Sequence, residues 1–155
     1  MPISVRLPDD SVRELCDGAT GADLARGIGP KLLEASLAVR VDGKLQDLNA
    51  PLVDGVQVSI VTSKDPASLE IVRHSAAHLL AQAVKRLFPE AKAGIGPVIE
   101  DGFYYDFQVE KFFTPEDLVA IEAEMVKVSQ EAHVVVREDL GRDEAIARFE
   151  SWVNS

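Results

Sequence analysis

The stretch that sets the fold of the N-terminal region is residues 3–15, which reads ISVRLPDDSVREL. Ile3, Val5 and Leu7 alternate with polar residues, and this alternation predicts a strand with one buried face. Residues 8–11 have the composition of a turn, and residues 12–15 return as a second strand. The chain is therefore expected to begin with a β-hairpin.

The residues that follow extend this hairpin into a small α/β unit. Thr20 and Asp23 have the spacing of a helix cap, and Gly29-Pro30 predicts the end of that helix. Asp42-Gly43 is a strong signal for a two-residue hairpin turn. Further strands are expected at residues 37–41, 44–48 and 56–61. A hairpin, a helix and then strands in this order predict a β-grasp, or ubiquitin-like, fold.

The composition is that of a globular protein. The 155 residues are 46% hydrophobic and 27% charged, which allows one ordinary domain or two small ones. No apolar run reaches the roughly twenty residues of a membrane span. The single cysteine, Cys16, excludes an internal disulfide and fits a reducing cytoplasm. A net charge of −10 argues against a chain that grips nucleic acid by itself.

Residues 66–88 have the pattern of a long helix. Apolar residues recur there at spacings of three and four, and Pro89 ends the pattern. The expected inner face consists of Leu69, Val72, Ala76, Leu79, Leu80, Ala83 and Leu87. A loop rich in glycine follows.

The rest of the chain is expected to alternate strands and helices. Phe103, Tyr105 and Phe107 should share one face of a strand, with Tyr104 on the other face. Thr114 and Pro115 predict the start of a helix. The inner face of that helix is expected to hold Leu118, Ile121, Met125 and Val128. A short strand at residues 133–137 and a last helix at residues 143–153, with Phe149 inward, complete the prediction.

The candidate site begins with His74 and His78. A spacing of four on a helix places both imidazoles on one face, one turn apart, as in half of a zinc site. Ser75 stands where a metalloprotease would have glutamate, so that class is excluded. The pair is equally compatible with two helix histidines that face water. Gly96 indicates a close backbone approach or a tight loop.

Two segments then carry a family resemblance. Residues 73–78 read RHSAAH and residues 96–106 read GPVIEDGFYYD, which resembles the start of the editing domain of the threonyl-tRNA synthetase family. Residues 1–62 are similar to the TGS domain of bacterial members. The resemblance implies an α+β chain, with a β-grasp TGS domain at residues 1–63. The first part of an editing domain would occupy residues 64–155.

The family's function is implied with it. The family attaches threonine to tRNA-Thr with ATP, in a class II catalytic domain, and its editing domain hydrolyses mischarged seryl-tRNA-Thr. His74 and His78 match two catalytic histidines, while Tyr105, Tyr104 and Gly96 are expected to bind substrate. The family's second ligand pair, a cysteine and a histidine, has no counterpart here. The histidines are thus at most half of a metal site.

The resemblance also implies partners and cofactors for the full enzyme. These are tRNA-Thr, ATP, magnesium and zinc, in a cytoplasmic homodimer that does not enter a membrane. The chain is expected to be an N-terminal fragment, inactive by itself. One alternative is a free-standing TGS-type module that binds RNA or protein without catalysis. Another is a small metallohydrolase in which two chains each supply one histidine pair.

Overall fold

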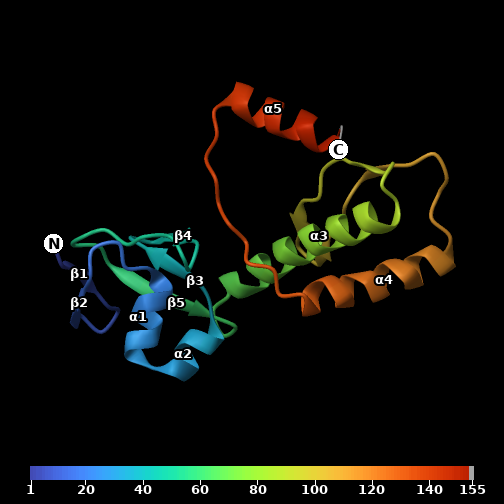
Figure 1. The fold of residues 1–155 in the computed structure, drawn as a ribbon. Coiled ribbons are helices and arrows are strands. Elements are labelled where there is room, and N and C mark those ends of the chain that lie inside the picture. Colours follow the sequence, from blue (N-terminus) through green and yellow to red (C-terminus); the bar gives the residue numbers. More distant parts are fainter. Residues whose placement is uncertain (154–155) are drawn as a thin grey trace.

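The structure is a computed structural model that describes the backbone of residues 1–153 and the side chains of residues 1–150. Figure 1 shows a β-sheet unit at the N-terminus, from which a long helix leads into a second, mainly helical region. The elements of the first unit are β1 (Ile3–Arg6), β2 (Val12–Leu15), α1 (Gly21–Ile28), α2 (Pro30–Ala35), β3 (Ser36–Val41), β4 (Lys44–Gln46) and β5 (Val58–Thr62).

The first unit has the strand arrangement of a β-grasp fold. β1 pairs antiparallel with β2, and β3 lies between β4 and β5, antiparallel to both. A parallel bridge between Arg6 and Gln57 connects β1 to the start of β5. The resulting order is β2-β1-β5-β3-β4. The predicted α+β class and β-grasp fold are therefore confirmed.

The predicted helix cap and hairpin turn of this unit are both present. The Thr20 hydroxyl accepts a hydrogen bond from the Asp23 amide at 3.2 Å, and the Asp23 carboxylate accepts one from the Thr20 amide at 3.0 Å. This capping box satisfies two amides at the start of α1. Asp42 and Gly43 both have positive φ, as the predicted hairpin turn requires.

The core of the unit lies between α1 and the sheet. Leu24 of α1 is 1% exposed, and Val39 and Val58 of the sheet are fully buried. Gly29 ends α1, as predicted. The chain then turns at once into α2, which was not predicted and has Pro30 as its first residue. Proline fits the first turn of a helix because no partner is needed for its missing amide.

The second region is built on two long helices. Its elements are α3 (Ala67–Leu87), β6 (Lys92–Ala93), β7 (Val98–Ile99), β8 (Gly102–Phe103), β9 (Phe107–Gln108), α4 (Pro115–Gln130) and α5 (Arg142–Val153). α3 and α4 lie side by side, and β7 and β8 form a hairpin that packs on α3 (Figure 1). β6 pairs with β9. A small core forms around Ala83, Val84, Ala91 and Ile121.

The second region also corrects several predictions. Leu69 and Val72 of the expected inner face are 54% and 52% exposed, and Leu118 is 58% exposed. The expected aromatic strand is split, because β8 ends at Phe103 and β9 begins only at Phe107. Phe149 lies on α5 as predicted but is 60% exposed rather than turned inward.

Residues 133–137 do not form the predicted strand. Within residues 1–153 no strand pairs with this segment, and Val134, Val135 and Val136 are 84%, 86% and 73% exposed. A strand needs a neighbour for its amides and carbonyls, so β-branched composition alone does not make one. Among the described helices, none is long and apolar enough to cross a membrane.

Candidate functional site

The histidine pair, His74 and His78, lies on an exposed face of α3. The two Nε2 atoms are 3.0 Å apart, and the rings meet edge to face with centroids 4.6 Å apart. A spacing of four residues on a helix brings side chains of neighbouring turns together, as the sequence predicted. Both rings remain open to solvent on one side.

This distance is that of a hydrogen bond between the two rings. For a hydrogen bond between the two Nε2 atoms, one must carry a proton and the other must offer its lone pair. The pair therefore combines one donor and one acceptor. A neutral imidazole in this setting can accept a proton from water or from a hydroxyl group.

The pair also fits half of a zinc site. Zinc holds imidazole nitrogens at about 2.0–2.1 Å. Two nitrogens 3.0 Å apart can therefore bind one ion at neighbouring corners of its coordination shell, once the proton between them is released. A structural site needs four ligands. In the part of the chain that the structure describes, no group of three or more His, Cys, Asp or Glu side chains is arranged for a metal. His74 and His78 thus supply two nitrogen ligands for a metal.

Arg73, next to the histidine pair in sequence, holds the β7–β8 hairpin on α3. Its Nη1 atom donates to the carbonyl oxygens of Ile99 and Glu100, at 3.3 and 2.5 Å. Both carbonyls lie at the tip of the hairpin. No role for Arg73 was predicted from the sequence, although its position directly before His74 in the RHSAAH motif could have suggested one.

Gly96 and Tyr105, both expected to bind substrate, lie against each other. The Tyr105 ring occupies the space where a Cβ on Gly96 would stand. The same ring stacks on Phe107, with centroids 4.9 Å apart and planes 18° apart. Gly96 therefore provides room for an aromatic ring, which is the close approach that the glycine predicted.

Backbone hydrogen bonds hold this aromatic segment against the glycine loop. The Gly94 amide donates to the Asp106 carbonyl, and the Asp106 amide donates to the Ile95 carbonyl, both at 2.8 Å. Tyr104 projects to the other side and is 47% exposed. The predicted alternation of the two tyrosines is thus kept, even though the strand is interrupted.

The structure therefore brings the candidate residues together in two groups. His74 lies against His78, and Gly96 lies against Tyr105. Arg73 connects the groups, since it binds the hairpin that follows Gly96. Tyr104 stands apart from both groups on the exposed side of its segment.

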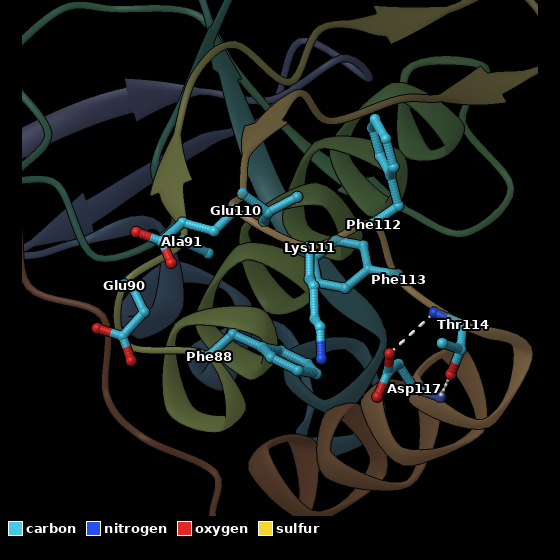
Figure 2. A pocket seen from close by; sticks show the side chains of 10 residues that line it. Phe88, Glu90, Ala91, Glu110, Lys111, Phe112, Phe113, Thr114 and Asp117 are labelled. Carbon is cyan, nitrogen blue, oxygen red and sulfur yellow. Dashed lines mark hydrogen bonds between the residues drawn. The ribbon is translucent and has the colours of Figure 1, made fainter.

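A separate pocket lies near the other end of α3. Its cavity has a volume of about 630 Å³, and Phe88, Phe113 and Lys111 are among the residues around it (Figure 2). Thr114 and Asp117, also at its edge, already bind each other as the capping box of α4. Fourteen residues of helix separate Phe88 from His74, which is about 21 Å. This pocket is therefore not part of the histidine site.

His133, the third histidine, belongs to an ion-pair cluster. Arg86 of α3 binds both carboxylate oxygens of Glu131, at 2.8 and 2.7 Å, and His133 Nε2 lies 2.7 Å from the same carboxylate. The hydrogen bonds from Arg86, followed by that from His133, lower the pKa of Glu131 to about 2. This cluster joins the C-terminal ends of α3 and α4 and leaves His133 away from the pair.

Comparisons with known proteins agree with this architecture. Residues 3–62 match the family model of the TGS domain. The chain is 53% identical over 147 residues to a threonine–tRNA ligase of Citrifermentans bemidjiense, a match covering 95% of this chain and 23% of that protein. It is 51% identical over 149 residues to the corresponding ligase of Cupriavidus necator, covering 96% of this chain and 24% of that protein.

The chain thus spans about a quarter of the length of the curated relatives it matches. The similarity runs through both the β-grasp unit and the helical region, since it covers nearly the whole chain. The family model accounts for the first of these regions. Residues 3–62 are therefore a TGS domain, and nearly the whole chain corresponds to the N-terminal region of threonine–tRNA ligases.

Proposed function

We propose that this chain is the part of a threonine–tRNA ligase that binds tRNA-Thr and takes part in editing. Residues 1–63 would be the TGS domain, and residues 64–155 the first part of the editing domain. The whole ligase would attach threonine to tRNA-Thr with ATP and magnesium, as a cytoplasmic homodimer. The observation that carries the editing proposal is the convergence of His74 and His78 Nε2 atoms at 3.0 Å on an exposed helix face.

Editing is needed because the synthetic site can discriminate only weakly between threonine and serine. Serine is threonine without one methyl group, and a group of that size gives only about 1–3 kcal/mol of discrimination. Seryl-tRNA-Thr must therefore be removed at a second site. The reaction is hydrolysis of an ester: water attacks the carbonyl carbon, and the tRNA ribose oxygen leaves.

The histidine pair would accept and hold protons in this step. The bond between the two rings uses both Nε2 atoms, so the free lone pair of a neutral pair is on Nδ1 of the donating ring. That nitrogen would accept the proton of the attacking water, or orient a ribose hydroxyl that assists it. The neighbouring ring would hold that imidazole in position through the bond between the two nitrogens. Tyr105 and Gly96 would form the wall of the substrate pocket, with Tyr104 at its exposed edge.

Zinc, if bound, would supply a Lewis acid or a fixed template beside the ester. His74 and His78 would be its ligands from this chain, and the other ligands would come from another part of the ligase. The chain's own residues suffice for the positioning role described above. Because the pair supplies only two donors, the isolated chain is expected to hydrolyse seryl-tRNA-Thr poorly or not at all.

The test replaces each histidine in a full-length ligase that carries this chain. His74→Ala and His78→Ala should each slow hydrolysis of seryl-tRNA-Thr by about 10²-fold or more, as loss of a general base does, while threonylation continues. Ser75→Ala is the matched control, because its hydroxyl only binds the Ile71 carbonyl of the same helix. Normal clearance of seryl-tRNA-Thr in both histidine variants would contradict the proposal.

The alternative is a binding module without catalysis. It predicts that seryl-tRNA-Thr hydrolysis does not depend on the histidines, while binding of the chain to RNA or protein depends on the β-grasp unit. The same variants separate the two functions. The editing function is favoured because the similarity to ligases continues through the helix that carries the histidine pair.

A further inference from the structure

A four-residue connection joins the TGS domain to α3. β5 ends at Thr62, and α3 begins at Ala67. Figure 1 shows α3 leading directly away from the sheet beyond this point. Domains joined by a short exposed segment are expected to move relative to each other unless specific contacts prevent it. The contacts at this junction therefore decide whether the two units move separately.

Further hydrogen bonds join the connection to the end of β5 and to the first turn of α3. The Asp65 amide donates to the Thr62 carbonyl, and the Ser68 amide donates to the Asp65 carbonyl, both at 2.9 Å. The Ser68 hydroxyl donates to the Ser63 carbonyl at 3.2 Å, and Ser68 itself is buried. These bonds shape the turn but do not attach α3 to the sheet.

The attachment to the sheet comes from Arg40, the last residue but one of β3. Its guanidinium binds Asp65 through two hydrogen bonds, Nη1 to Oδ2 at 3.0 Å and Nη2 to Oδ1 at 3.2 Å. Both side chains are partly buried, with 32% and 21% of their surface exposed. Two parallel bonds between planar groups fix orientation as well as distance.

The same carboxylate also caps the helix. Asp65 Oδ1 accepts a hydrogen bond from the Ala67 amide at 2.9 Å, at the first residue of α3. The bond to Arg40, followed by that from Ala67, lowers the pKa of Asp65, so the carboxylate stays charged in both contacts. One side chain thus ties the start of α3 to β3, which lies between two other strands of the neighbouring sheet.

From this geometry we propose that the Arg40–Asp65 pair is a rigid joint, which makes the TGS domain and α3 move as one body. His74 lies seven residues beyond Ala67, about 10 Å along the helix. A partner that reorients the TGS domain therefore carries the histidine pair with it. This coupling is a property of the joint itself and holds whatever reaction the histidines serve.

The test measures the distance between the two units in the whole 155-residue chain. Cys16, the native cysteine, is exposed in the TGS domain, and Gln82→Cys adds an exposed site on α3. Spin labels on both residues report a distance distribution by pulsed electron paramagnetic resonance. We expect a narrow distribution in this parent protein.

Two variants break the joint in different ways. Arg40→Met keeps most of the arginine stem but removes both bonds to Asp65. Asp65→Asn keeps an oxygen that can cap α3 but removes the ion pair. Each should broaden the distance distribution while circular dichroism shows that the helices remain. Arg26→Met is the control, because Arg26 pairs with Asp23 inside α1 and spans no junction.

The outcomes are distinct. Broadening in both variants, with an unchanged distribution in Arg26→Met, supports the joint. An unchanged width in a folded Asp65→Asn protein overturns it, even where Arg40→Met fails to fold. The readout uses neither tRNA nor hydrolysis. A failure of the joint therefore leaves the editing proposal standing, and a failure of the editing proposal leaves the joint standing.

Discussion

The ring of Tyr105 fills the space beside Gly96 that any other residue would need for its Cβ. This contact orders the aromatic segment, because the ring packs against the Gly96 backbone and also stacks on Phe107. It also places the predicted substrate residues in a packed arrangement before any substrate arrives.

Gly96→Ala should therefore destabilise the second region. A Cβ at this position would lie 2.5 Å from Tyr105 Cε2, so the ring must move. Overpacking of this kind costs about 1–3 kcal/mol of unfolding free energy. Urea unfolding followed by circular dichroism measures the loss. Gly102→Ala is the control, since nothing lies within 4 Å of its Cβ and the change should stay within about 0.5 kcal/mol. Equal effects of the two substitutions would refute the packing role.

Leu24→Ala should remove a central contact of the TGS core. Leu24 is 1% exposed, and truncation of a buried leucine costs about 2–5 kcal/mol. Ile28→Ala on the same helix should cost clearly less, because Ile28 is already 41% exposed. Chemical denaturation of both variants gives the comparison. A loss at Leu24 no larger than that at Ile28 would contradict the assignment of the core.

Thr20→Ala should weaken the start of α1. The substitution removes the oxygen that accepts a hydrogen bond from the Asp23 amide. Loss of such a cap lowers the free energy of unfolding by about 0.5–2 kcal/mol. Thr20→Ser should retain most of the stability, because its hydroxyl can make the same bond. Thermal unfolding of the two variants measures the difference. Similar losses in both would mean that the threonine methyl, rather than the cap, stabilises the helix.

Glu131→Gln should lower stability in a manner that depends on pH. Arg86 holds the pKa of Glu131 at about 2, below its ordinary 4.5. A lowered pKa contributes stability that is complete above pH 4.5 and is lost as the pH falls toward 2. The difference in Tm between the wild type and Glu131→Gln should therefore be largest at neutral pH and shrink below pH 4.5.

The control for this pH series is Glu122→Gln, an exposed glutamate of the same helix. It should change Tm little at any pH, because exposed carboxylates add little to stability. A Tm difference for Glu131→Gln that is the same at pH 7 and pH 3 would show that Arg86 does not stabilise its charged form.

Much of the fold could be predicted because its causes are local. The Thr20 cap, the Asp42-Gly43 turn and the alternation of Ile3, Val5 and Leu7 each act within a few residues. The i, i+4 spacing likewise brought His74 against His78 without help from the rest of the chain. α2 was missed because Gly29-Pro30 ends one helix and begins another with the same residues.

Burial was harder to predict, since it depends on what packs on each face. Leu69 and Val72 fit the periodicity of an inner face, yet they are half exposed because α4 covers other parts of α3. Residues 133–137 have strand composition, but a strand forms only where a neighbour accepts its hydrogen bonds. Periodicity describes one element and carries no information about its neighbours.

Residues close together in the chain specify the succession of elements in the β-grasp unit, the two capped helices and the spacing of the histidine pair. Tertiary packing, by contrast, brings Arg73 to the β7–β8 hairpin, Arg86 to Glu131 and Arg40 to Asp65. These partners are 25 to 45 residues apart. By its charge alone, each arginine could bind any of many carboxylates and carbonyls. The packing of the backbone decides which of them lies within reach.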